Sequence, residues 1–155
     1  MSTRTALQLH QDVAAPAQKV WDALVDWPSQ HEWMLGTRVR VSAGDGRGVG
    51  SQLVAFSGAG PLGFLDTMVI TEWDPPRRCV VDHTGRVVRG AGVFAVVPRS
   101  AHECTVVWRE ELDLPLGVLG ALGWPLVRAP FAAGVRLSLR RLARRCEGPG
   151  EAGPG

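Results

Sequence analysis

Residues 13–33 read VAAPAQKVWDALVDWPSQHEW and contain three of the six tryptophans of the chain. Pro16 stands where a first-turn proline belongs, and an apolar stripe follows it, which predicts an amphipathic helix of about three turns. The stripe consists of Val20, Trp21 and Leu24. Asp26 as an N-cap, with Pro28 in the first turn, predicts a second short helix directly afterwards. Two short helices are therefore expected before a long segment in which apolar and polar residues alternate with period two.

The rest of the sequence is typical of one antiparallel sheet closed by a helix. Alternating segments joined by short turns predict seven strands, at 5–13, 37–43, 51–58, 62–73, 77–84, 87–97 and 102–114. A long amphipathic helix is expected from about Pro130, with Leu139 and Leu142 on its apolar side. The predicted fold class is α+β: a curved seven-stranded antiparallel sheet wrapped around a long C-terminal helix. One domain at 1–147 and a disordered tail at 148–155 are expected.

Composition limits the classes of partner. Basic residues exceed acidic ones by only two, and 45 % of the residues are hydrophobic, so we expect a globular protein without a nucleic-acid partner. Three cysteines without metal-ligand spacing indicate reduced thiols, a cytoplasmic location, and neither a metal nor a cofactor. The start of the chain lacks the apolar core of a secretory signal. A monomer or a homodimer is expected.

Two segments invite other interpretations. Residues 114–135 are long and apolar, but Pro125, Pro130 and Arg128 interrupt them, so we expect a loop and the start of a helix, buried against the sheet, rather than stable membrane insertion. The glycine-rich GDGRGVG at 44–50 lacks the lysine and the following helix of a phosphate-binding loop, and it is predicted to be a hairpin turn.

Hairpin geometry assigns side chains to the two faces of the sheet, because directly opposed residues share a face. A turn centred on Pro75 and Pro76 opposes Met68 with His83, so Asp66, Glu72 and His83 are expected on the inner face. Trp73 is then expected on the outer face.

A turn at 98–101 opposes Val93 with Val106 and Ala91 with Trp108 on the inner face. The same register places Phe94 on the outer face. It also opposes Arg89 with Glu110, as a structural ion pair or as partners for the polar end of a ligand.

This order of elements resembles the START-like, helix-grip superfamily, also called SRPBCC, which includes polyketide cyclases/dehydrases and lipid-transfer domains. The resemblance covers about residues 5–147. It rests on the opening stretch, on GVGS and ITEWDPPRRCVV, and on GAGVFAVVP, CTVVWREEL and LSLRRLARRCEG. It implies a cavity between sheet and terminal helix that holds an apolar or aromatic small molecule. It implies no catalytic residues, because the superfamily shares no common set.

The leading hypothesis is therefore a protein that binds a hydrophobic or aromatic small molecule, such as a lipid or polyketide. The expected cavity lining is Trp33, Phe64, Met68, Val106, Trp108, Phe131 and Val135, with polar groups from Asp66, His83, Arg89 and Glu110. Trp21 is expected in the core, Trp27 as an anchor between the short helices, and Trp33 either in the core or against the ligand.

Two alternatives remain open. An enzyme of the aromatase/cyclase or dehydratase type would use His83 as a general base oriented by Asp66; against this, a lone histidine on a strand is commonly hydrogen-bonded locally. The arginines at 136–145 could instead make the terminal helix a protein-interaction module, or simply a solvated face.

Overall fold

The computed structural model describes residues 3–59, 62–85, 89–114 and 118–148, and it confirms the predicted fold class. Seven strands form one antiparallel sheet in the order β1-β7-β6-β5-β4-β3-β2. The strands are β1 (Thr3–Val13), β2 (Thr37–Ala43), β3 (Gln52–Ala59), β4 (Leu62–Asp74), β5 (Arg78–Thr84), β6 (Arg89–Ser100) and β7 (Glu103–Leu114). The helices are α1 (Ala17–Leu24), the 3-10 helix η1 (Trp27–Glu32) and α2 (Val118–Glu147).

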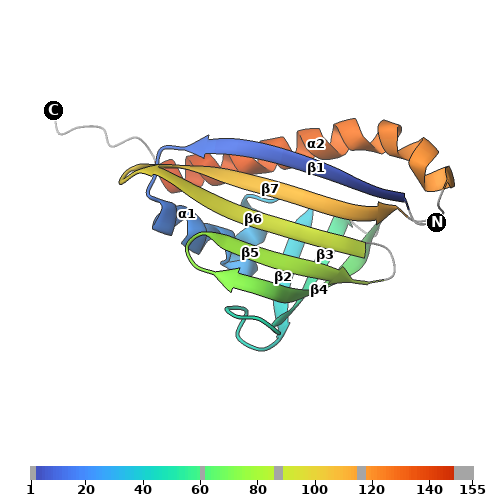
Figure 1. The fold of residues 1–155 in the computed structure, drawn as a ribbon, viewed down its shortest axis with the longest axis horizontal. Helices are drawn as coiled ribbons and strands as arrows, with labels where there is room; N and C mark the ends of the chain where they lie inside the picture. The colour runs from blue at the N-terminus through green and yellow to red at the C-terminus, as the bar shows by residue number, and fades with distance from the viewer. Residues whose placement is uncertain (1–2, 60–61, 86–88, 115–117, 149–155) are drawn as a thin grey trace.

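The sheet curves so that all three helices lie on its inner side (Figure 1). Helix α2 runs along β1, while α1 and η1 follow β1 and lead into β2 at the opposite edge of the sheet. Every strand except the β1 and β2 edges has a partner on both sides. The helices therefore close the concave face, and the space between the two layers holds the core.

The two short helices form where the opening stretch predicts them, with small differences. Helix α1 has eight residues, about two turns rather than three, and Pro16 is its N-cap rather than its first helical residue. Its apolar stripe is buried: Val20, Trp21 and Leu24 are each at most 2 % exposed. The second helix is a 3-10 helix, and Asp26 stands at its N-cap without a side-chain hydrogen bond.

Helix α2 begins twelve residues earlier than expected. It starts at Val118 and runs through Pro125 and Pro130, and the large apolar side chains of Leu122, Leu126 and Val127 are exposed. The predicted loop buried against the sheet at 114–135 was therefore wrong, although residues 115–117 lie outside the described part. Prolines are tolerated here because water can hydrate the carbonyls that lose their N–H partners.

None of the helices in the described parts of the chain carries an apolar run sufficient to cross a lipid bilayer.

The register of β4 and β5 is confirmed near the predicted site. Met68 pairs with His83 and Ile70 with Val81, as the diproline turn predicts. A β-bulge between Ile70 and Glu72 then shifts the register by one residue. The bulge exchanges the faces of the next two side chains: Glu72 is exposed, and Trp73 packs edge-on against Trp21, with ring centroids 5.2 Å apart. The predicted faces of these two residues were wrong for this reason.

The predicted register of β6 and β7 was wrong. Phe94 pairs with Trp108 and Val96 with Val106, so Phe94 lies on the inner face and Ala91 does not. The supposed turn residues Pro98 and Arg99 belong to β6, and the pairing extends to Ser100 and Glu103 past a bulge. Proline fits at position 98 because the pairing of β6 with β5 ends at Ala95, so no neighbour needs its N–H.

Candidate functional site

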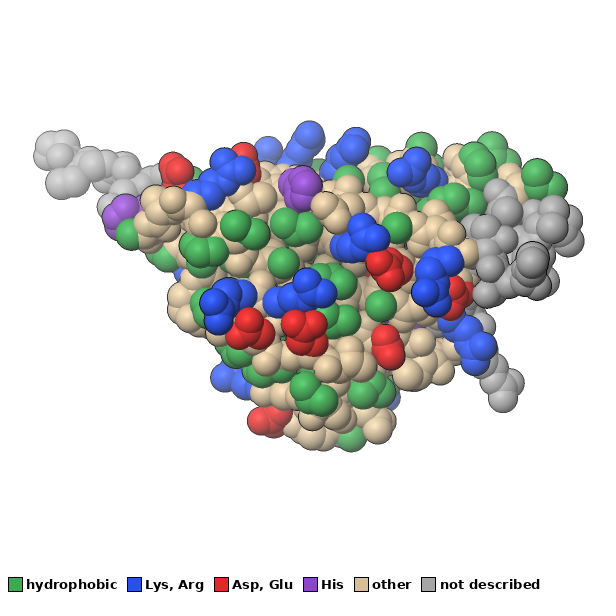
Figure 2. All heavy atoms as spheres, in the orientation of Figure 1, with side chains coloured by type: hydrophobic (Ala, Val, Ile, Leu, Met, Phe, Trp, Pro, Cys, Tyr) green, Lys and Arg blue, Asp and Glu red, His purple; other side chains and the backbone are tan. Residues whose placement is uncertain are grey.

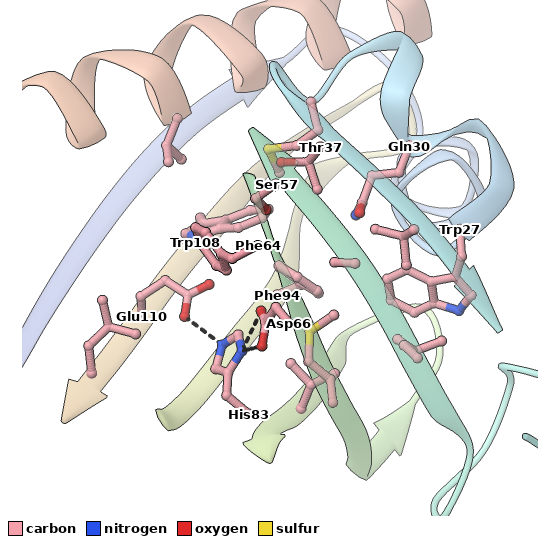
Figure 3. Close-up of a pocket in the computed structure, with 18 of the residues that line it drawn as sticks. Trp27, Gln30, Thr37, Ser57, Phe64, Asp66, His83, Phe94, Trp108 and Glu110 are labelled. Atoms are coloured by element: carbon pink, nitrogen blue, oxygen red, sulfur yellow. Dashed lines mark hydrogen bonds and ion pairs between the residues drawn. The ribbon is translucent and has the colours of Figure 1, made fainter. Parts of the chain in front are cut away.

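A cavity of about 190 Å³ lies between the inner face of the sheet, η1 and the middle of α2 (Figure 3). Its wall is mostly apolar and aromatic, and it comes from both layers. The lining residues are Trp27, Gln30, Met34, Thr37, Val39, Leu53, Ala55, Ser57, Phe64, Asp66, Met68, Val81, His83, Phe94, Trp108, Glu110, Leu112, Phe131 and Val135. Since a dry engineered cavity of roughly 150 Å³ accepts benzene, this one has room for a molecule of one or two rings.

Three ionisable side chains meet in one part of this wall, and we call Asp66, His83 and Glu110 the triad. The Nδ1–H of His83 donates to Asp66 Oδ2 and Oδ1, at 2.9 and 3.1 Å. Its Nε2 lies 3.1 Å from Glu110 Oε2 (Figure 3). No more than 10 % of any of these side chains is exposed. The imidazole is therefore held at both nitrogens by carboxylates in a nearly water-free place.

Glycines of the intervening strand allow the triad to form. His83 on β5 and Glu110 on β7 are separated by β6, where their paired residues are Gly90 and Gly92. A Cβ atom at Gly92 would stand 3.2 Å from Glu110 Oε1 and 3.2 Å from a methyl group of Val81. Because Gly92 carries no side chain, Glu110 reaches His83 above the middle strand. Gly90 is required for another reason: its φ is +126°, and a Cβ there would collide with the backbone of Glu111.

The contacts within the triad shift the pKa values of His83 and Glu110. Burial would lower the pKa of His83, but hydrogen bonds to Asp66 and Glu110, together with their charges, raise it to about 10. Burial raises the pKa of Glu110, and its contact with His83 offsets this only in part. His83 is therefore protonated at neutral pH, and protons bound at its Nε2 and at Glu110 are strongly coupled. Such a group can hold or move a proton inside the cavity.

Most of the side chains predicted for the site come together in the cavity. They are Phe64, Asp66, Met68, His83, Trp108, Glu110, Phe131 and Val135. Their role in binding or catalysis stays a prediction.

Three predicted site residues lie elsewhere. Val106 is fully buried in the core, and Trp33 is 1 % exposed behind the cavity wall, packed edge-on against Trp108. Arg89 lines a second, polar depression, which shares His83 with the cavity and also includes Arg4, Asp82, Glu111 and Asp113. It does not oppose Glu110, whose strand neighbour is Gly92. The predicted pair of Arg89 and Glu110 was therefore wrong, as a consequence of the β6–β7 register.

Sequence reasoning missed two aromatic residues of the wall. Phe94 was placed on the outer face by the wrong register, whereas its ring centroid is 4.4 Å from that of Trp108. The Nε1–H of Trp27 donates to the carbonyl of Gly46, so Trp27 ties the 3-10 helix to the turn between β2 and β3, and its ring also lines the cavity. The alternating glycines 90 and 92 were the available signal, because they indicate space for large side chains on neighbouring strands.

No group of three His, Cys, Asp or Glu side chains within the described ranges is arranged to hold a metal ion. Both ring nitrogens of His83 are already engaged by carboxylates, so the imidazole offers no lone pair to a ligand.

Solved structures with the same fold are similar over nearly the whole chain. An aromatase/cyclase from Streptomyces sp. R1128, Zhui, gives a TM-score of 0.78 at 17 % identity and covers 99 % of both chains. A START superfamily protein from Mycobacterium smegmatis gives 0.73 at 15 % identity, covering 92 % of this chain and 97 % of that one. Norcoclaurine synthase from Thalictrum flavum, in complex with dopamine and hydroxybenzaldehyde, gives 0.64 at 20 %, covering 90 % and 86 %. At these identities the likeness shows the fold alone.

Sequence comparisons give the family. A search of curated proteins found no match. The sequence profile described as polyketide cyclase / dehydrase and lipid transport matches residues 4–147, which is nearly all of the chain. The chain belongs to the polyketide cyclase/dehydrase and lipid transport family.

Proposed function

We propose that the protein binds an apolar or aromatic small molecule of one or two rings in the cavity, with the polar end of the molecule at the triad. The observation that carries this proposal is the composition of the wall: aromatic and aliphatic side chains surround a single cluster of ionisable groups. Pockets of this kind gain affinity from apolar burial and orientation from a few polar contacts. The three described cysteines are free and buried, which agrees with a cytoplasmic protein.

Two measurements test this binding function. Native mass spectrometry of the purified protein is expected to show an additional mass that leaves on denaturation. A neutral two-ring dye, 6-propionyl-2-(dimethylamino)naphthalene, is expected to give a saturable, blue-shifted emission that small aromatic molecules displace. A protein that carries no ligand and gives no saturable dye signal would contradict the proposal.

A second candidate function is proton transfer on the bound molecule, of the aromatase/cyclase or dehydratase type. The observation that favours it is the triad itself, in which a histidine and a glutamate with raised pKa values share a cavity wall. The Glu110 carboxylate, held in place by His83, would take a proton from the carbon beside a ligand carbonyl. The electron pair of the broken C–H bond would pass to the carbonyl oxygen as an enolate, and Glu110 would return a proton to the carbon.

Hydrogen–deuterium exchange separates the two functions. In D2O, 2-tetralone exchanges the protons beside its carbonyl slowly, and the exchange can be followed by NMR. If the protein is a catalyst of this class, it accelerates exchange, and Glu110→Gln returns the rate to that of buffer while the ketone still binds. If the wild-type protein binds 2-tetralone but does not accelerate its hydrogen–deuterium exchange, proton transfer is excluded and the binding function remains.

A further inference from the structure

The cavity wall holds more negative than positive charge. Among the described residues that line it, Asp66 and Glu110 carry carboxylates, His83 is the single basic side chain, and no lysine or arginine is present. With all three groups ionised, one negative charge has no counterpart in this part of the wall, and the raised pKa of Glu110 reflects its burial and this surplus. Buried charges are rarely left without a partner, because removing them from water is costly.

The unbalanced charge is accessible at one atom. Both oxygens of Asp66 accept from His83 Nδ1–H, and Glu110 Oε2 faces His83 Nε2. No hydrogen bond within the described residues reaches Glu110 Oε1. The indole N–H of Trp108 lies close enough to the Glu110 carboxyl to lower its pKa, but it is not aligned with either oxygen as a hydrogen bond and has no other partner. In Figure 3 this second oxygen of Glu110 points away from His83.

Aromatic rings stand beside this carboxylate. Trp108 is two residues from Glu110 on the same face of β7, and its ring packs against Phe94 with centroids 4.4 Å apart. The faces of such rings attract an organic cation, and the attraction grows in a site shielded from water. A carboxylate oxygen next to an aromatic wall is the combination that recognises a protonated amine on an apolar body.

We propose that the cavity selects ligands that carry a protonated amine on an aromatic or apolar body, and that it rejects carboxylates. The inference rests on the proposed binding function and names its ligand class. The amine N–H would donate to Glu110 Oε1 in a charge-assisted hydrogen bond. Glu110 is already buried in the free protein. The free energy of removing its carboxylate from water is therefore spent during folding and does not weaken the binding of the amine. A carboxylate at the same place would meet a like charge.

Three ligands with one ring and different head groups test this selection: 2-phenylethylamine, 2-phenylethanol and 3-phenylpropionate. By calorimetry at pH 7.5 we expect the amine to bind at least about tenfold more tightly than the alcohol, and the carboxylate not to bind measurably. Glu110→Gln should reduce the ratio of amine to alcohol affinity to about one. Glu111→Gln is the matched control, because Glu111 is the next residue on β7, lines the polar depression instead and pairs with Arg109. It should leave the ratio as in the wild type.

The outcomes separate this inference from the function on which it rests. Alcohol or carboxylate binding as tight as that of the amine would overturn the amine selection and leave the binding function intact. If none of the three ligands and no neutral dye binds, the binding function fails as well. Should Glu110→Gln not fold, 13C NMR of the wild-type carboxyls gives the answer. The amine should lower the pKa of Glu110 and the alcohol should not, and equal titration curves would contradict the proposal.

Discussion

Gly92 decides whether Glu110 can lie beside His83. A methyl group at this position would stand 3.2 Å from Glu110 Oε1 and from Val81, which is closer than nearly all real contacts of a Cβ. We expect Gly92→Ala to move the Glu110 side chain, to weaken its contact with His83, and to destabilise the fold by about 1–3 kcal/mol. Urea unfolding gives the stability, and NMR titration of the His83 ring should show a lower pKa than in the wild type.

Gly48→Ala is the control for this change. Gly48 lies in the turn between β2 and β3, and a Cβ there meets no atom within 4 Å. The urea midpoint of Gly48→Ala and the pKa of His83 in this variant should be the same as in the wild type. Equal behaviour of the two alanine variants would show that the triad does not depend on the glycine of β6.

The raised pKa of His83 predicts that the protein loses stability as the pH rises. The folded protein binds the proton with a pKa of about 10, against 6.5 for the unfolded chain. The stabilisation is therefore complete below pH 6.5 and disappears as the pH rises through 10, on the order of 3–5 kcal/mol in all. Burial also raises the pKa of Glu110, and this acts in the same direction.

Urea midpoints at pH 6.5, 7.5 and 8.5 check this dependence. This range stays below 9.0, the ordinary pKa of a thiol; above it the unfolded chain would ionise Cys79 and Cys146, whose pKa values burial raises in the fold. The wild type should lose stability steadily across it, and His83→Gln, which cannot titrate, should change much less. Parallel pH profiles for the two proteins would mean that the carboxylates do not stabilise the imidazolium.

At the residue scale, the sequence predicts the partners of His83 only in part. The pair of Asp66 and His83 follows from the diproline turn, since a two-residue turn sets the register of β4 and β5 directly. The contact with Glu110 could not be derived the same way. It depends on the register of β7 across β6, and a bulge beside Pro98 changes that register.

Among the elements, α2 has two halves with different environments. Leu139 and Leu142 are at most 1 % exposed in the core, whereas Leu126 is 82 % exposed in the other half. We expect Leu139→Ala to cost about 2–5 kcal/mol of unfolding free energy, because it leaves a cavity in the packed layer. Leu126→Ala should change the stability by less than about 0.5 kcal/mol.

Urea unfolding of the two leucine variants measures this difference. The substitutions are chemically identical and lie in one helix, so helix propensity affects them alike. A large loss in Leu126→Ala would show that the first half of α2 packs against a surface in solution. In Figure 2 the hydrophobic side chains of this half are visible on the outside of the molecule.

Elements are easier to predict than their ends. The seven strands, α1 and α2 are predicted from periodicity, and η1 from Asp26 and Pro28. Most predicted strand ends differ by one to three residues from the observed ones. The start of α2 could not be predicted from the sequence, because Pro125 and Pro130 each indicate the end of a helix when only their neighbours in the sequence are considered. Only the exposure of that half, a property of the whole fold, makes the prolines tolerable.

The whole molecule combines a packed core with a hollow that the core does not need. Val39, Leu53 and Ala55 are buried, yet they line about 190 Å³ of free space. Atoms beside a void lose contacts on one side, so the hollow lowers the stability of the free protein. Natural proteins keep a cavity of this kind where a ligand fills it, so that some stability of the free protein is exchanged for function.

Filling the hollow should therefore separate stability from binding. Ala55 projects into the cavity from β3, and Ala55→Leu adds three carbon atoms there. We expect this variant to be at least as stable as the wild type in urea, because the new methyl groups are buried in existing space. We also expect it to lose the saturable signal of the neutral dye.

Val54→Leu is the matched control, since Val54 is the adjacent residue on β3, does not line the cavity and is partly exposed. It should bind the dye like the wild type. Dye binding that survives Ala55→Leu unchanged would place the ligand outside the cavity. Loss of both stability and binding would show instead that the wall around Ala55, which pairs with Asp66 on β4, is too rigid to accept a larger side chain.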